Sequence, residues 1–218
     1  MIMQQRRRGE APPPKTPSGE VFKVPETYWE DLEKCDIETI CANAGAKNYP
    51  PVGVLLPFLK EYLLVNRQNR SVCRQGHGQW ERTDNPLLQL VCLVYLLNAG
   101  PESISQEMIS VQQLKTAHFF MGPHELKVEP LLKLYGKDLE GFKKAAGHIG
   151  GERLDLADAA YKFLAFPKVP LYYLFWAGDE EFDPRLSILF DRSIEYHLAA
   201  DAIWGLVNLV SEILTGVA

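Results

Sequence analysis

The stretch that most constrains the fold is residues 166–191, FPKVPLYYLFWAGDEEFDPRLSILFD. An apolar aromatic segment, residues 169–176, is followed by a glycine turn carrying four acidic residues and then by a second apolar segment that ends at Asp191. The connection is short, which favours antiparallel pairing, because parallel strands need a crossover of about a dozen residues or more. The stretch therefore predicts two antiparallel strands joined by an acidic turn.

Composition limits the class of protein. A chain of 218 residues with 46% hydrophobic residues has enough apolar surface for a sizeable core. The net charge of −5 argues against broad nucleic-acid binding, which needs a basic face. The four cysteines form no recognised zinc or iron–sulfur pattern, so we interpret them as free thiols in a reducing cytoplasm. The longest apolar run, residues 86–99, is too short for a bilayer, which takes about 20 residues, so we expect no membrane association.

The chain divides into a tail and one domain. Residues 1–24 are basic and rich in proline, and they lack the periodic apolar residues that would offset chain entropy, so we expect a disordered tail. No apolar segment follows Arg6-Arg7-Arg8, which argues against a secretory signal and favours a cytoplasmic protein. Residues 25–218 are expected to form a single domain.

Helical and strand patterns alternate irregularly within that domain. Helices are expected at residues 25–45, with Asp36 as a candidate cap for a second short helix inside that range, and at residues 86–97, 125–135, 138–146 and 200–214. Strands are expected at residues 52–59, 62–65, 159–166, 169–176 and 186–190. Residues 74–86 read as a loop, and no internal repeat is visible. Without regular strand–helix–strand units, the pattern predicts an α+β fold with a mainly antiparallel sheet packed with helices and an amphipathic C-terminal helix.

The acidic turn is the first candidate site. Asp179, Glu180, Glu181 and Asp183 are crowded into five positions just after Trp176. Neighbouring carboxylates repel one another, and a hard cation such as Mg²⁺, Ca²⁺ or Mn²⁺ would relieve that repulsion. The alternative is an acidic turn whose side chains cap backbone amides and pair with nearby arginines.

Two further residues extend this hypothesis. Asp191 ends the second strand, and it would share a site with Asp179 if the sheet brought both strand ends to one rim; otherwise it caps the following turn. His197 and Asp201 are four residues apart and would face the same way on a helix, which is the beginning of a general-base arrangement. The alternative for this pair is an ordinary helix surface.

The linked pattern of FP-x-x-P, W-x-G-D-E-E-F and LFD, followed by HLAADAIWGL, resembles a prokaryotic family known as domain-of-unknown-function family 3786. Some members look fused to an iron–sulfur cluster domain, which implies a setting in anaerobic redox or one-carbon metabolism. This chain has no closely spaced cysteine set, so we expect no iron–sulfur cluster on the chain itself. The resemblance implies no catalytic residue; Trp176, Gly178–Phe182 and Asp191 match its motif.

Two functional hypotheses follow, and the sequence leaves open whether the protein is an enzyme. The first is an accessory or binding module whose protein partner carries a redox cofactor. The second is a metal-dependent enzyme or metal-binding protein with its site at Trp176, Asp179, Glu180, Glu181 and Asp191, assisted by His197. The sequence identifies no substrate, cofactor or metal.

Overall fold

The structure, a computed structural model, describes residues 24–76 and 78–216. These residues form six α-helices and two antiparallel sheets of five strands each. The predicted α+β class with antiparallel pairing and a C-terminal helix is therefore confirmed, although the strands are divided between two sheets. The predicted disordered tail, residues 1–24, lies outside the described residues except for Val24.

The N-terminal half consists of two helices, a meander of five strands and a third helix. In order these are α1 (Glu26–Lys34), α2 (Ile37–Ala44), β1 (Lys47–Tyr49), β2 (Gly53–Phe58), β3 (Glu61–Asn66), β4 (Ser71–Gly76), β5 (Gln79–Arg82) and α3 (Pro86–Asn98). Asp36 begins α2 by accepting a hydrogen bond from the Thr39 amide. Asn85 and Pro86 begin α3 as predicted, with the Asn85 side chain as the cap.

The C-terminal half follows a similar order. Its elements are α4 (Glu129–Tyr135), α5 (Leu139–His148), β7 (Glu152–Leu154), β8 (Ala159–Phe166), β9 (Val169–Trp176), β10 (Arg185–Asp191), the 3-10 helix η4 (Arg192–Tyr196) and α6 (Ala200–Thr215). Asp138 begins α5 by accepting a hydrogen bond from the Gly141 amide, as Asp36 does in α2. The strand order is β6-β10-β9-β8-β7, in which β6 (Met108–Ile109) comes from the connection between the halves.

The two halves are repeats of one structural unit, which the sequence prediction missed. Each contains two helices, a meander of four strands and a closing helix, and a fifth strand lies beside the last strand of each meander, β5 beside β4 and β6 beside β10. The sequence retains little trace of this beyond Asp-Ile-Glu at 36–38 and Asp-Leu-Glu at 138–140. Asp36 and Asp138 cap corresponding helices, α2 and α5, and the rest of the repeat is visible only in the order and pairing of the elements.

Reciprocal contacts join the two units. The two-residue turn between β8 and β9 rests on the end of α2, and the turn between β2 and β3 rests on the end of α5. A Cβ atom on Gly45 would lie 2.8 Å from Cβ of Pro167, and a Cβ atom on Gly150 would lie 2.9 Å from Cβ of Lys60. Both glycines have positive φ, +63° and +86°. The chain therefore leaves each helix at the point where the hairpin of the other unit makes contact.

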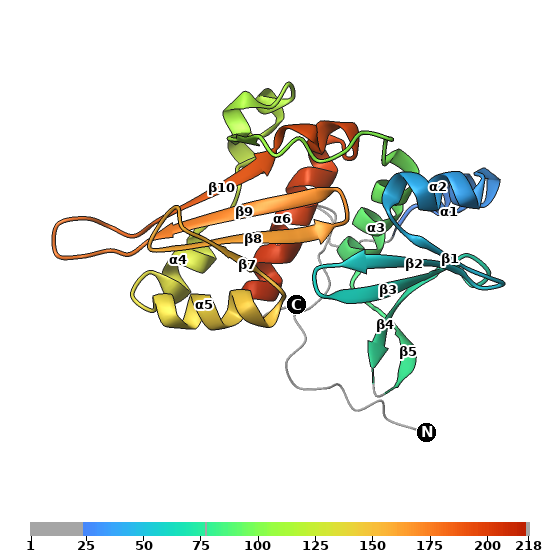
Figure 1. Cartoon of the computed structure of the whole chain (residues 1–218), viewed down its shortest axis with the longest axis horizontal. Coiled ribbons are helices and arrows are strands. Elements are labelled where there is room, and N and C mark those ends of the chain that lie inside the picture. The colour runs from blue at the N-terminus through green and yellow to red at the C-terminus, as the bar shows by residue number, and fades with distance from the viewer. Residues whose placement is uncertain (1–23, 77, 217–218) are drawn as a thin grey trace.

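Aromatic rings fill the seam between the units. Phe166 stacks on Tyr95 with ring centroids 4.4 Å apart and also contacts Phe58, the equivalent residue of the other hairpin, at 5.4 Å. The Tyr95 hydroxyl donates to the carbonyl of Ala44 at 2.9 Å and accepts from the amide of Lys168 at 3.3 Å. The closing helices α3 and α6 pack together near the middle of the molecule (Figure 1), and one hydrophobic core includes residues of both units.

Some element predictions were wrong. Residues 74–86 do not form a loop, because β4 continues to Gly76 and β5 pairs with it. The helix predicted at residues 125–135 begins only at Glu129. Pro57 is tolerated in β2 because β1 pairs with Gly53–Leu55 and ends before the proline.

Within the described residues no helix is long and apolar enough to cross a membrane. The apolar run predicted to be buried is α3, which lies inside the core.

The seam leads to a stability prediction. Gly45→Ala and Gly122→Ala both place a side chain at similar positive φ, +63° and +59°, but a Cβ at Gly122 meets nothing within 4 Å. We expect Gly45→Ala to lower the free energy of unfolding by about 1–3 kcal/mol more than Gly122→Ala, because it also pushes against Pro167. Urea denaturation of both variants measures the difference. Equal destabilisation would show that the contact between α2 and the β8–β9 turn contributes nothing.

Candidate functional site

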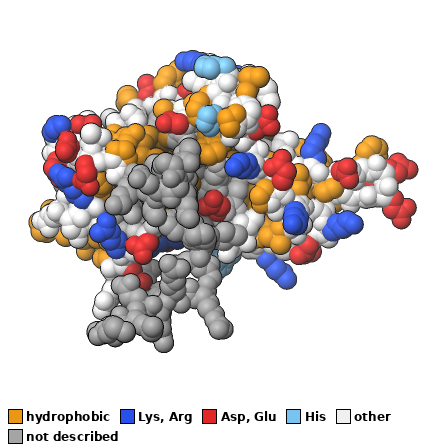
Figure 2. Space-filling model, turned by 180° about the vertical axis from the view of Figure 1, so that it is seen from behind, with side chains coloured by type: hydrophobic (Ala, Val, Ile, Leu, Met, Phe, Trp, Pro, Cys, Tyr) orange, Lys and Arg blue, Asp and Glu red, His pale blue; other side chains and the backbone are white. Residues whose placement is uncertain are grey.

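The predicted acidic turn lies at the tip of the hairpin formed by β9 and β10. This hairpin extends well beyond the rest of the molecule (Figure 1), and acidic and hydrophobic side chains gather at its projecting end (Figure 2). The tip comprises residues 177–184, between the two strands. We call these residues the acidic tip.

Asp179 shapes the acidic tip from within. Its Oδ1 accepts hydrogen bonds from the amides of Glu181 and Phe182 at 2.8 and 2.7 Å, and its own amide donates to the carbonyl of Phe182 at 2.9 Å. These bonds, that from Glu181 first, hold the pKa of Asp179 below its ordinary value. Asp179 therefore behaves as the turn cap that the sequence offered as an alternative.

The charged and aromatic side chains of the acidic tip face solvent. Glu180, Glu181 and Asp183 are exposed, and the Phe182 ring is 69% exposed. At the base of the tip, the guanidinium of Arg185 lies 4.1 Å from the centre of the Trp176 ring, a cation–π contact between paired residues of the two strands. This contact stiffens the hairpin just before it leaves the body of the protein.

Asp191 does not lie beside the acidic tip. In the antiparallel register Arg185 pairs with Trp176 and Phe190 pairs with Leu171, so Asp191 and the tip are at opposite ends of β10. Six residue steps separate Arg185 from Asp191, roughly 20 Å of strand. The shared rim considered for Asp179 and Asp191 is therefore wrong, because the two follow opposite ends of an antiparallel pair.

Asp191 is instead the buried centre of a hydrogen-bond network. Its carboxylate accepts five bonds, from the amide and hydroxyl of Ser193, the amide and hydroxyl of Ser105, and the amide of Gln106, at 2.6–2.9 Å. Burial by itself raises the pKa of Asp191, but the bonds from Ser193 and Ser105 outweigh it and lower the pKa below its ordinary value. The cap of η4 predicted for Asp191 is thus present, together with ties to a distant segment.

His197 is buried at the end of η4, and its side chain has no exposed surface. It is not on a helix with Asp201, since α6 begins at Ala200, and the Asp201 carboxylate accepts from the amide of Ala202. The proposed His–Asp pair is therefore wrong. Neither imidazole nitrogen has a hydrogen-bond partner among the residues that the structure describes. Burial first, and then the charge of Lys168, hold the pKa of His197 below its ordinary value.

The described residues contain no group of three or more His, Cys, Asp or Glu side chains placed to hold a metal ion. All four cysteines are free, as predicted, with Cys35 exposed and the other three buried. Two open depressions of about 450 and 520 Å³ lie elsewhere, one at the ends of α5 and α6 and the other around Pro50 and Arg67. Neither contains a residue of the predicted site.

Comparison with known proteins identifies a family. The profile of a domain of unknown function, DUF3786, matches residues 36–212. The chain belongs to this family. Searches of curated proteins and of solved structures find no match.

The DUF3786 fold separates the residues that the sequence grouped into one motif. Phe166 and Pro167 pack in the seam between the units, Asp179 and Phe182 lie at the acidic tip, and Asp191 ties η4 to the connection between the units. Sequence reasoning missed Ser105 and Gln106, the distant partners of Asp191. Their segment has no periodicity and no motif, so no local signal marks them.

The network around Asp191 leads to a second stability prediction in this DUF3786 protein. Asp191→Asn leaves buried amide and hydroxyl donors with fewer acceptors, and we expect it to lower the free energy of unfolding by about 3 kcal/mol at pH 7. Because the folded-state pKa of Asp191 is lowered, its contribution is complete above the unfolded value near 3.9 and is lost as pH falls further.

Asp179→Asn is the matched control, since an asparagine oxygen can accept the same two amide bonds at an exposed turn. Urea titrations at pH 7 should show a large loss for Asp191→Asn and little change for Asp179→Asn. Similar small losses in both variants would contradict the structural role of Asp191.

Proposed function

We propose that this DUF3786 protein is a binding module that docks onto a partner protein through the acidic tip. The observation that carries the proposal is the Phe182 ring, 69% exposed at the end of a projecting hairpin. Three exposed carboxylates, those of Glu180, Glu181 and Asp183, surround it in the sequence. Protein interfaces commonly combine aromatic side chains at their centre with a polar rim.

Energetics favour this interpretation of Phe182. Burying a phenylalanine side chain contributes about 1.5–3 kcal/mol, which the free protein forgoes by leaving the ring in water. The hydrogen bonds of Asp179 hold the turn in the conformation that presents the ring, so little ordering remains to be done on docking. Burial of the ring would add favourable free energy to docking, and the pre-formed turn would lower the entropic cost of docking onto a partner that offers an apolar pocket.

The charges define the partner's chemistry. A rim of carboxylates on a chain with net charge −5 is complementary to lysine and arginine side chains around such a pocket. Charge complementarity of this kind accelerates association and selects orientation more than it adds affinity. The partner is therefore a protein with an apolar pocket in a basic surface. The family resemblance supports a setting in the cytoplasm, in anaerobic redox or one-carbon metabolism, with the redox cofactor held by the partner.

A photo-crosslinking amino acid at position 182 tests the proposal in cells of the native host. We expect one discrete crosslinked adduct, whereas the same amino acid at Leu134, an exposed residue of α4, should give none. Replacing Glu180, Glu181 and Asp183 together by lysine should abolish the adduct, because the rim would then repel a basic surface. An adduct that survives this charge reversal, or equal labelling from Leu134, would count against the proposal.

Cation binding is the alternative function of the same tip, supported by three exposed carboxylates within four positions. It predicts that millimolar Mg²⁺, Mn²⁺ or Ca²⁺ raises the melting temperature, since a ligand that binds the native state alone stabilises it. Replacing Glu180, Glu181 and Asp183 together by lysine should abolish that rise in melting temperature. We expect no shift, because the Oδ1 of Asp179 is engaged by two amides; a reproducible rise that the variant removes would favour the cation reading instead.

A further inference from the structure

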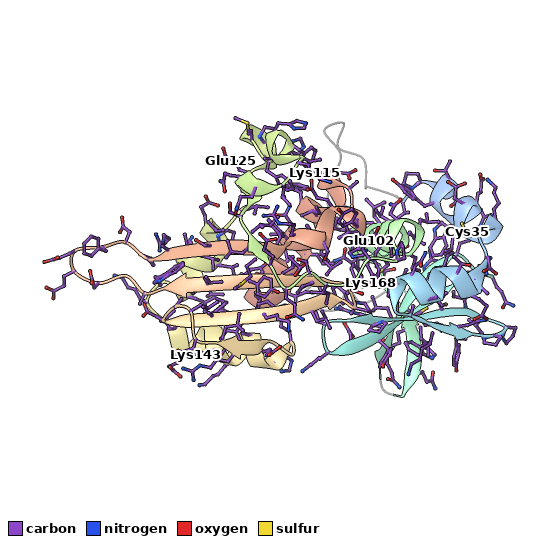
Figure 3. All side chains as sticks on the ribbon, turned by 45° about the horizontal axis from the view of Figure 1, so that its top comes forward. Cys35, Glu102, Lys115, Glu125, Lys143 and Lys168 are labelled. Carbon is purple, nitrogen blue, oxygen red and sulfur yellow. The ribbon has the colours of Figure 1, made fainter. Side chains whose placement is uncertain are left out.

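The connection between the two units crosses from the end of α3 to β6 and is tied down near both of its ends. We call residues 99–107 the strap. The amide of Gly100 donates to the carbonyl of Tyr196 at 3.2 Å, and the carbonyl of Gly100 accepts from Nζ of Lys168 at 2.8 Å. Figure 3 shows Glu102 and Lys168 close to each other in this region, one on the strap and one on the β8–β9 turn.

The far end of the strap is held by β10 and η4. The amides of Ser105 and Gln106 donate to Asp191, and Arg192 forms an ion pair with Glu107. Gln106 has a φ of +63°, the left-handed region that non-glycine residues rarely adopt. Such a conformation costs about 1–2 kcal/mol, so the strap is held closed against local strain.

His197 lies directly after Tyr196, the residue that accepts the first tie. Within residues 24–76 and 78–216, neither ring nitrogen of His197 has a partner, and such burial is expensive even for a neutral imidazole. Three charged groups from different elements act on the ring, namely Lys168 of the β8–β9 turn, Glu102 of the strap and Asp191 of β10. Two of these three, Lys168 and Asp191, also hold the strap in place.

We propose that the strap is a proton-operated latch, closed while His197 is neutral and opened when His197 takes up a proton. A charged imidazole in this position would be buried without an acceptor, close to the ammonium group of Lys168. In the open form that we propose, water reaches the ring and that penalty is removed. Because the strap continues into β6, which pairs with Phe190 and Asp191, opening also loosens the edge of the C-terminal sheet.

The direction of the pH dependence follows from linkage. Burial, and then Lys168, lower the pKa of His197 in the closed form, while Glu102 and Asp191 act in the opposite direction. In the open form the ring is solvated and has a pKa near 6.5. The latch is therefore fully stable above that value, and opening becomes up to tenfold more favourable for each pH unit below it. Asp191 stays ionised in this range, because its pKa is lowered from an ordinary value that is already near 4.

Hydrogen exchange of the Ser105 and Gln106 amides measures opening in the full chain. After correction for intrinsic exchange rates, we expect their opening equilibrium to rise by up to about fivefold between pH 6.5 and pH 5.5, because the ring of the open form titrates near 6.5. His197→Phe places a somewhat larger ring at this position and removes the titration, so its opening equilibrium should not vary with pH. His118→Gln, at an exposed histidine, is the matched control and should behave as wild type.

A second measurement needs no variant and covers the case in which His197→Phe does not fold. In an NMR titration of the wild type, the His197 ring protons should titrate together with the loss of protection at Ser105 and Gln106. Protection that is independent of pH would overturn the proposal, as would pH dependence retained in His197→Phe. The acidic tip lies at the other end of β10, so failure of the docking experiment leaves this test unaffected.

Discussion

The packing of Phe166 between Tyr95 and Phe58 is the interaction on which the rest of the structure depends. The β8–β9 turn of one unit rests on the end of α2 in the other, and the β2–β3 turn rests on the end of α5. The result is one core that crosses the seam. Two five-stranded sheets with short helices would each have been marginal alone, since small domains bury a smaller fraction of their surface. Joined through equivalent hairpins, they share the burial that each needs.

Capping residues and hydrophobic periodicity predicted most of the helices and strands, because both signals depend on residues close together in the sequence. Asn85-Pro86 begins α3 and Asp191 caps η4 as expected, because caps are determined by residues within one turn. The sequence analysis missed the repeat because the two halves share an order of elements and almost no residue pattern. The contacts of the candidate site residues were harder to predict from the sequence than the repeat. Asp191 was singled out as an acid at a strand end, but its partners, Ser105 and Gln106, are more than 80 positions away in the chain, and no local pattern connects them.

Burial and nearby donors decide what each carboxylate does in this protein. Asp179 and Asp191 both end up with a lowered pKa, yet one organises an exposed turn and the other fixes a buried junction. Crowding of acids in the sequence drew attention to residues 179–183, where solvent screens the repulsion. The isolated acid, Asp191, has the larger structural role, because burial leaves its hydrogen bonds without competition from water.

Strand β9 connects the seam to the acidic tip without a hinge. It begins at Val169, next to the turn that contacts Gly45, and ends at Trp176, where Arg185 stacks on the ring. Six of its eight residues pair with β10 and most also pair with β8, so it cannot bend independently of the sheet. The sheet therefore sets the position of the base of the acidic tip, and the hydrogen bonds of Asp179 hold the turn that carries Phe182. A rigid arm loses less conformational entropy on docking than a free loop, which is why a projecting hairpin suits recognition of one partner in one orientation.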